Sequence, residues 1–243
     1  MTEKYSDPRF AAVAENYRVI ADRVANAAIR SGRNPEDVIL MAATKTVPVE
    51  VINHAIDCGL RYIGENRVQE FMDKYEKIQW SAGVTGHIIG RLQTNKVKYI
   101  ADKVSCIQSV DSLKLAKEIS KHCERLQKRM QVLVEVNIGN EESKGGIQPE
   151  SLEDFLWQIS ELQGIAVNGL MAIPPFCEKK SDICNYFSRM KQYFIDIGAK
   201  KIDNVSMNCL SMGMSSDYEE AILCGATMVR VGSSLFGERI YPK

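Results

Sequence analysis

The sequence predicts a single (β/α)8 TIM barrel of the α/β class that fills residues 1–243 as one domain, with one extra helix at its N-terminal end. Short β-rich runs alternate eight times with segments of helical periodicity. The chain has 243 residues, of which 45% are hydrophobic and 26% charged, and this is an ordinary size and composition for a one-domain barrel. No linker or low-complexity run interrupts the alternation.

The first predicted element is a helix over residues 7–31, before any strand. It is opened by Asp7 and Pro8 and closed by Gly32, a common pair of helix start and stop signals. Its apolar residues recur every three or four positions, at Phe10, Val13, Tyr17, Ile20, Val24 and Ala27.

Eight strand–helix units follow in order. Strands that alternate with crossover helices form a parallel sheet, and eight units favour closure into a barrel over an open sheet. The strands and the segments after them are VILMAAT and 49–58, RYIGE and 66–78, VTGHIIG and 94–102, SCIQSV and 112–129, QVLVEVNI and 150–162, VNGLMAI and 180–198, VSMNCLSM and 217–224, and TMVRVGS with the closing segment SSLFGER.

Composition excludes several classes of partner. The 31 basic and 31 acidic residues are evenly spread and give a formal net charge of zero, so neither nucleic acid nor an anionic membrane is an expected partner. The seven cysteines form no C-x-x-C pair, which argues against both a disulfide framework and a zinc site. The polar N-terminus and the lack of a long apolar run favour a soluble, cytoplasmic protein. We expect a monomer that binds a small molecule and no metal.

Polar residues follow the apolar runs at the expected carboxyl ends of the strands, where barrel enzymes build their sites. Residues at these positions are Lys45, Glu65, Asn66, His87, Ser109, Asp111, Asn137, Met171, Ser211, Arg230, Gly232 and Ser233.

Lys45 ends the run VILMAATK and so projects from a strand whose interior is apolar. Desolvation there would lower the pKa of the amine toward the nucleophilic form that a Schiff base requires. A lysine at a strand end can equally extend into solvent, and its position alone favours that second interpretation.

Two loops rich in glycine and serine, LSMGMSSD and VGSSLFGER, follow the seventh and eighth strands. Barrels commonly bind phosphate there. Gly213 and Gly232 would permit close backbone approach, and Ser211, Ser215 and Ser233 would supply hydroxyl groups. The same loops could simply turn the chain and cap helices, and the sequence favours neither interpretation.

Strand alternation places Arg230 on the same face as Met228 and Gly232, toward the barrel interior. A guanidinium buried there needs a partner. That partner could be an acid, with Glu135, Asp111 and Glu65 as candidates, or the ring nitrogen of a pyridine cofactor. An always protonated arginine would weaken such a ring as an electron sink. For His87 a satisfied core position is at least as plausible as catalysis.

Several motifs in order strongly resemble one family, the pyridoxal phosphate homeostasis proteins, whose barrels are similar to the N-terminal domain of alanine racemase (fold type III). The motifs are AATKTVP around Lys45, YIGENRVQE, GHIIGRLQTNK, VEVNIGNEESKGG, GLMAI, LSMGMSSDYEEAI and VRVGSSLFGER. The resemblance runs from about residue 7 to residue 239, which is nearly the whole chain.

The resemblance implies that pyridoxal 5′-phosphate (PLP) is the cofactor and that Lys45 holds it covalently as a Schiff base. By the same resemblance Arg230 faces the pyridine nitrogen, and Ser211, Gly232 and Ser233 hold the phosphate. Asn66, His87 and Met171 are then expected to line the pocket.

The family implies PLP binding in vitamin B6 and amino-acid homeostasis, with apo PLP enzymes as recipients and no established catalytic reaction. The alternative is a PLP-dependent amino-acid racemase. A racemase needs acid–base groups on both faces of the substrate carbon, and alanine racemase takes the second from a further C-terminal domain, whereas this sequence ends at Lys243. A third hypothesis is a barrel enzyme that acts on a sugar phosphate without PLP.

Overall fold

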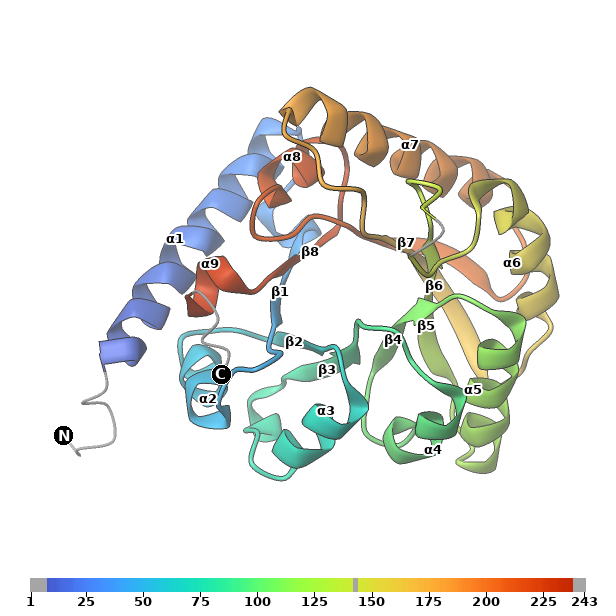
Figure 1. Ribbon diagram of the computed structural model, residues 1–243, viewed down its shortest axis with the longest axis horizontal. Coiled ribbons are helices and arrows are strands. Elements are labelled where there is room, and N and C mark those ends of the chain that lie inside the picture. The colour runs from blue at the N-terminus through green and yellow to red at the C-terminus, as the bar shows by residue number, and fades with distance from the viewer. Residues whose placement is uncertain (1–7, 142–143, 238–243) are drawn as a thin grey trace.

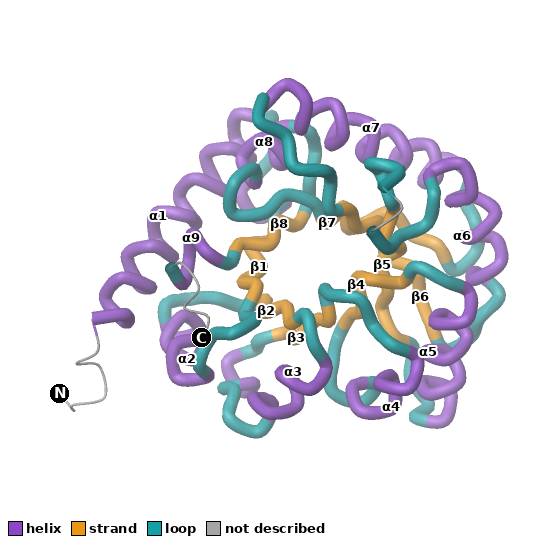
Figure 2. Tube along the Cα trace, in the orientation of Figure 1, coloured by secondary structure: helices purple, strands orange, loops and turns teal. Residues whose placement is uncertain are grey.

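The computed structural model describes residues 8–141 and 144–237, in which eight parallel strands close a barrel in sequence order (Figures 1 and 2). The ring closes where β1 pairs with β8, and Met41 lies opposite Arg230 in that pair. The predicted barrel is therefore confirmed. Its strands are β1 (Ile39–Ala43), β2 (Tyr62–Glu65), β3 (Thr85–Ile88), β4 (Cys106–Val110), β5 (Met130–Val136), β6 (Ile165–Ala172), β7 (Val205–Ser211) and β8 (Met228–Val231).

Helices surround this ring on its outside (Figure 1). The extra N-terminal helix is confirmed as α1, which packs against α2, α8 and α9 through an apolar stripe that includes the buried Val13, Ile20 and Val24. The helices are α1 (Pro8–Arg30), α2 (Val49–Asp57), α3 (Val68–Tyr75), α4 (Val97–Ile100), α5 (Leu113–Arg125), α6 (Leu152–Ser160), α7 (Lys180–Ala199), α8 (Tyr218–Leu223) and α9 (Ser233–Phe236).

Several helices are shorter than their sequence patterns predict, among them α3 and α6. The segment predicted as helix over 94–102 contains a 3-10 turn at Thr94–Lys96 followed by the four-residue α4. The pattern over 112–129 ends at Arg125, because Gln127 adopts a left-handed backbone with φ of 53°. The differences at α4 and α5 lie in the outer layer, away from the barrel interior.

Apolar side chains form two separate layers. The larger one lies between the strands and the helices, and the smaller one fills the barrel interior with Met41, Ile89, Cys106, Leu133, Met171, Cys209 and Met228. Strand alternation sorts the residues between the two layers. Polar side chains are also buried inside the ring, among them His87, Gln108, Ser211 and Arg230.

Gly169 breaks the alternation on β6. The pairing of β6 with both neighbouring strands shifts register between Val167 and Gly169. Gly169 has φ of 146°, and a Cβ atom there would lie 1.8 Å from the carbonyl oxygen of Cys209. Only glycine permits this close approach, and the shift gives Met171 the inward side of the strand.

Within the described ranges, no helix is long and apolar enough to cross a membrane.

Candidate cofactor-binding site

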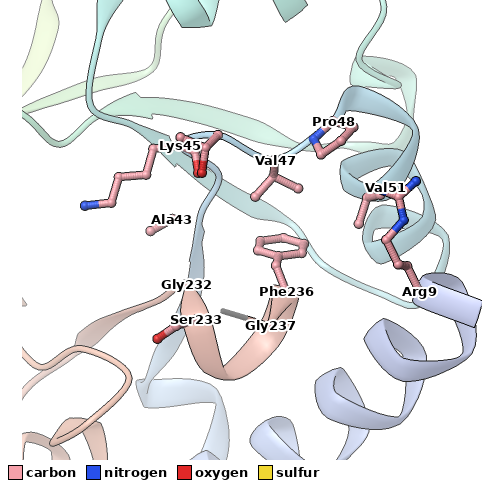
Figure 3. Close-up of a pocket in the computed structure, with 11 residues that line it drawn as sticks. Arg9, Ala43, Lys45, Val47, Pro48, Val51, Gly232, Ser233, Phe236 and Gly237 are labelled. Carbon is pink, nitrogen blue, oxygen red and sulfur yellow. The ribbon is translucent and has the colours of Figure 1, made fainter. Parts of the chain in front are cut away.

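Lys45 lies at the carboxyl end of β1, two residues beyond Ala43. Ile39, Met41 and Ala43 face the barrel interior, and continuing this alternation gives Lys45 the inward side. Lys45 is half-buried and lines a cavity of about 270 Å³ together with Gly232 and Ser233 of the eighth unit. Figure 3 shows the Lys45 side chain extending away from Phe236 and Val47.

A buried ion-pair cluster from α3 holds the loop that carries Lys45. Lys74 Nζ lies 2.6 Å from Glu65 Oε1 and 2.9 Å from Glu70 Oε1, and it donates to the carbonyl oxygen of Thr44 at 2.9 Å. Thr44 also donates its hydroxyl to Glu65 Oε1 at 2.8 Å. Thr44, directly before Lys45, is therefore held by hydrogen bonds to both α3 and β2.

Thr46, directly after Lys45, has a strained backbone. Its φ of 65° lies in the left-handed region, which is unfavourable for a β-branched residue. The backbone N–H of Thr46 donates to Glu70 Oε1, which holds this conformation. The strain and the cluster together orient the peptide bonds around Lys45.

The loops after β7 and β8 meet at the start of α9. Ser215 Oγ accepts hydrogen bonds from the backbone N–H groups of Gly232 at 3.0 Å and of Ser234 at 3.3 Å. Gly213 has φ of 92°, and a Cβ atom there would lie 2.5 Å from the side chain of Ala221. These loops gather backbone N–H and hydroxyl donors beside the cavity of Lys45, and such donors are the groups that bind a phosphate.

Arg230 is buried inside the ring with 4% of its surface exposed. It donates from Nη1 to Ser211 Oγ at 2.5 Å and from Nη2 to the carbonyl oxygen of Ala172 at 3.0 Å. Burial lowers the pKa of Arg230 to about 10, so the guanidinium stays protonated at neutral pH. Its hydrogen bonds run to a hydroxyl and a carbonyl, and Glu65 points outward to Lys74 instead.

Ser211 links Arg230 to a second buried polar residue, Gln108. Its hydroxyl donates to Gln108 Oε1 at 2.7 Å, and Gln108 Nε2 lies 2.9 Å from His87 Nδ1. Ser211 is thus fully buried between Arg230 and Gln108, below the loops that gather at α9.

The location predicted for His87, at the carboxyl end of its strand, is wrong. His87 pairs with Cys106, the first residue of β4, so the stagger of the strands places it low in the barrel. Its side chain lines a cavity of about 600 Å³ at the opposite end of the ring, beside Tyr62, Cys106 and Met228. His87 is therefore a barrel-interior residue and does not reach the mouth.

The other predicted residues take up different places around the mouth. Asn66 lines a groove of about 890 Å³ on the carboxyl face, together with Arg67, Arg91 and Asp111. Met171 lies in the apolar interior. The structure therefore brings Lys45 to Gly232 and Ser233 in one cavity, and places the remaining predicted residues inside the ring or along its rim.

Two residues of this region were missed by the sequence analysis. Gln108 is a polar residue inside an otherwise apolar strand, with the same inward parity as Cys106, and that pattern could have identified it. Lys74 has the pattern of an ordinary helix-surface lysine, and no local signal marks its contact with Glu65.

The carboxyl pair at the rim is formed by Glu135 and Asp111. Both approach Gly145, because a Cβ atom there would lie 3.3 Å from Asp111 Oδ2 and 3.9 Å from Glu135 Oε2. Burial first, and the nearby Asp111 second, raise the pKa of Glu135 to about 7. Among the described residues, no group of three or more His, Cys, Asp and Glu side chains is arranged to hold a metal ion.

The stability of the protein should depend on pH through His87. Burial lowers the pKa of His87 from 6.5 to about 4, so the unfolded chain takes up a proton first as the pH falls. The free energy of unfolding should then decrease by up to about 3 kcal/mol through this residue between pH 6.5 and pH 4.

Denaturant unfolding at a series of pH values, on the wild type and on His87→Met, measures this contribution. Glu135 acts with the opposite sign, since its raised pKa favours the folded state at low pH, but it is present in both proteins and cancels in their difference. Parallel stability curves for the two proteins would contradict the prediction.

Comparison with known proteins identifies relatives over nearly the whole chain. The family model described as alanine racemase, N-terminal domain, matches residues 9–240. A pyridoxal phosphate homeostasis protein of Aquifex aeolicus (strain VF5) is 46% identical over 222 residues, which cover 91% of this chain and 96% of that protein. A pyridoxal phosphate homeostasis protein of Escherichia coli (strain K12) is 38% identical over 234 residues, which cover 95% of this chain and 98% of that protein.

A solved structure is similar over the same range. The structure of PipY from Synechococcus elongatus PCC7942 with PLP bound superposes with a TM-score of 0.78 and 32% sequence identity, and covers 90% of this chain and all of that one (100%).

Proposed function

This chain belongs to the alanine racemase N-terminal domain family, and on that premise we propose that it binds PLP in the barrel mouth and serves in vitamin B6 and amino-acid homeostasis. The observation that carries the proposal is the shared cavity of Lys45, Gly232 and Ser233 at the carboxyl end of the strands. It joins an amine to the glycine- and serine-rich loop after β8, which Ser215 of the loop after β7 contacts through its hydroxyl group. PLP bound in PipY, a relative with the same fold, supports this ligand.

The roles proposed for individual residues follow from where they lie. Lys45 Nζ would hold the cofactor aldehyde as a Schiff base, and Gly232 and Ser233 would hold the phosphate with the first turn of α9. Arg230 would face the pyridine nitrogen from inside the ring, while Asn66 and Met171 would contact the cofactor from the rim and the interior.

Ser211 receives a different role from the one that the resemblance implies. Its hydroxyl accepts from Arg230 and donates to Gln108, so we assign it to hold Arg230 and not the phosphate. Ser215, whose hydroxyl already lies against the N–H groups of Gly232 and Ser234, takes its place among the phosphate-binding residues.

We propose that the protein carries PLP without turning over a substrate. When bound, PLP supplies an aldehyde and an electron-accepting ring. Arg230 stays protonated at neutral pH and has only donors, so it would donate a hydrogen bond to an unprotonated pyridine nitrogen. It would thereby disfavour protonation of that nitrogen and weaken the ring as an electron acceptor. The proposed recipients are apo PLP enzymes, and the proposed solution state is a monomer.

Binding of PLP is tested by absorbance spectra of the purified protein before and after exhaustive dialysis against buffer. We expect a yellow protein that retains about one PLP per chain. A phosphate-bearing compound without the aldehyde, retained equally well and with no chromophore, would favour the sugar-phosphate hypothesis and contradict a PLP-specific role.

The racemase alternative predicts exchange of the α-hydrogen of amino acids in deuterated buffer. We expect exchange no faster than with free PLP at the same concentration, measured by NMR across a panel of amino acids. Faster exchange that disappears in Glu135→Gln would identify an acid–base role for the rim carboxyl group and would overturn the non-catalytic proposal.

A further inference from the structure

A chain of hydrogen bonds runs through the barrel interior from the proposed cofactor site toward the opposite end of the ring. Its four members come from four different strands, β8, β7, β4 and β3, and each is buried: Arg230, Ser211, Gln108 and His87. Three contacts of 2.5, 2.7 and 2.9 Å join them in that order. Gln108 lies between Ser211 and His87, and His87 lies too low in the ring to touch a ligand at the mouth.

The direction of donation along this chain is set at its upper end. An arginine has only donors, so Ser211 Oγ accepts from Arg230 and its own hydroxyl hydrogen is left to donate to Gln108 Oε1. The oxygen end of the Gln108 amide therefore faces Ser211, and its NH2 end faces His87.

Two methionines support this orientation of the amide. Gln108 Nε2 lies 3.2 Å from Met228 Sδ and 3.6 Å from Met41 Sδ, and a thioether sulfur accepts hydrogen bonds but does not donate them. The third contact of Nε2 is with His87 Nδ1. That nitrogen must then accept, which makes His87 neutral and places its proton on Nε2.

We propose that Gln108 and His87 are positioning residues of the cofactor site, which hold the guanidinium of Arg230 in place through Ser211 by a one-way chain of hydrogen bonds. Two of the five donors of Arg230 are bonded to Ser211 and to the carbonyl oxygen of Ala172, and these bonds fix the plane of the guanidinium. Burial lowers the pKa of His87 to about 4, which agrees with a neutral ring. The effect on PLP rests on the proposed function, whereas the hydrogen bonds from Arg230 to His87 are present without a cofactor.

The first experiment reads the tautomer of His87 in PLP-free protein. With 15N-labelled histidine, NMR at pH 7 should show the Nε2–H tautomer for His87, assigned by its loss in His87→Met. In Gln108→Met, the Nδ1 resonance should move because its donor is gone. A Nδ1–H tautomer or an imidazolium ring would overturn the proposed direction of the chain.

The second experiment measures the effect on the cofactor. Gln108→Met keeps the length of the side chain among its apolar neighbours and removes the amide. We expect PLP to bind about three- to tenfold more weakly, the effect of one lost hydrogen bond, and the pH midpoint of the bound-cofactor absorbance to shift. Leu133→Met, a volume-conserving change elsewhere in the barrel interior, should leave both quantities at their wild-type values.

A double-variant cycle separates positioning from simple packing. If Gln108 acts on Arg230 only through Ser211, then Gln108→Met should change neither the affinity nor the pH midpoint further once Ser211→Ala is present. Full additivity of the two changes, or a Gln108→Met protein that matches the wild type, would overturn the proposal. The NMR experiment needs no PLP. A protein that failed to bind PLP would therefore contradict the proposed function, and the tautomer of His87 would still test the direction of the hydrogen-bond chain.

Discussion

Replacement of Lys45 by alanine is expected to abolish covalent capture of PLP by borohydride. Lys45 is the amine in the cavity that also contains Gly232 and Ser233, and reduction fixes a cofactor only where an imine has formed. Alanine removes the nucleophile and leaves the backbone of the loop tied to α3. We expect PLP to remain bound through the phosphate-binding loops, with a Kd raised about 100-fold, or about 2.7 kcal/mol.

Mass spectrometry of the reduced protein measures this result directly. In the wild type the added mass should map to the peptide that contains Lys45, and in Lys45→Ala no peptide should carry it. Lys121→Ala, at an exposed position on α5, is the matched control and should be labelled like the wild type. Labelling of another lysine at wild-type yield in both proteins would contradict the assignment of Lys45.

Replacement of Lys74 by methionine is expected to cause a large loss of stability. The Glu65 side chain is 1% exposed, and Lys74 is its ion-pair partner at 2.6 Å. Burial raises the pKa of Glu65, and Lys74 lowers it part of the way back. Glu65 Oε2 has no hydrogen-bond partner within the described part of the chain, so removal of Lys74 leaves a poorly compensated buried carboxyl group. We expect the free energy of unfolding to fall by about 3 kcal/mol at neutral pH.

The pH dependence of this loss identifies its cause. Without Lys74 the pKa of Glu65 in the folded protein should rise further, so that protonation favours the folded state and the loss shrinks as the pH falls. Urea unfolding at two pH values tests this, and Lys77→Met, at an exposed position after α3, should change stability by less than about 0.5 kcal/mol. Equal effects of the two lysine changes would show that the buried pair is not responsible.

The same change should also weaken PLP binding. Lys74 holds the carbonyl oxygen of Thr44, and Glu70 holds the strained N–H of Thr46, on the two sides of Lys45. Loss of this support would let the loop adopt other backbone conformations, so that less of the protein presents the amine toward the cavity. A PLP titration of folded Lys74→Met at low temperature measures the effect.

Much of this protein could be predicted from local patterns in the sequence. Alternating strand and helix segments predicted eight parallel strands in a closed ring, and the apolar run VILMAAT predicted that Lys45 follows the end of the first strand. The two-residue period of the eighth strand placed Arg230 inside the ring, on the same face as Met228. These predictions succeed because burial of one face repeats along a single segment and needs no knowledge of its neighbours.

The level of each side chain along the barrel axis, and its partners, were decided by the tertiary structure. His87 belongs to the lower part of the ring because β3 and β4 are staggered, and Met171 faces inward because β6 shifts register at Gly169. The partners of Ser211 and the contact between Lys74 and Glu65 join segments far apart in the chain. Stagger and register arise from the pairing of neighbouring strands, and no single segment of the sequence encodes them.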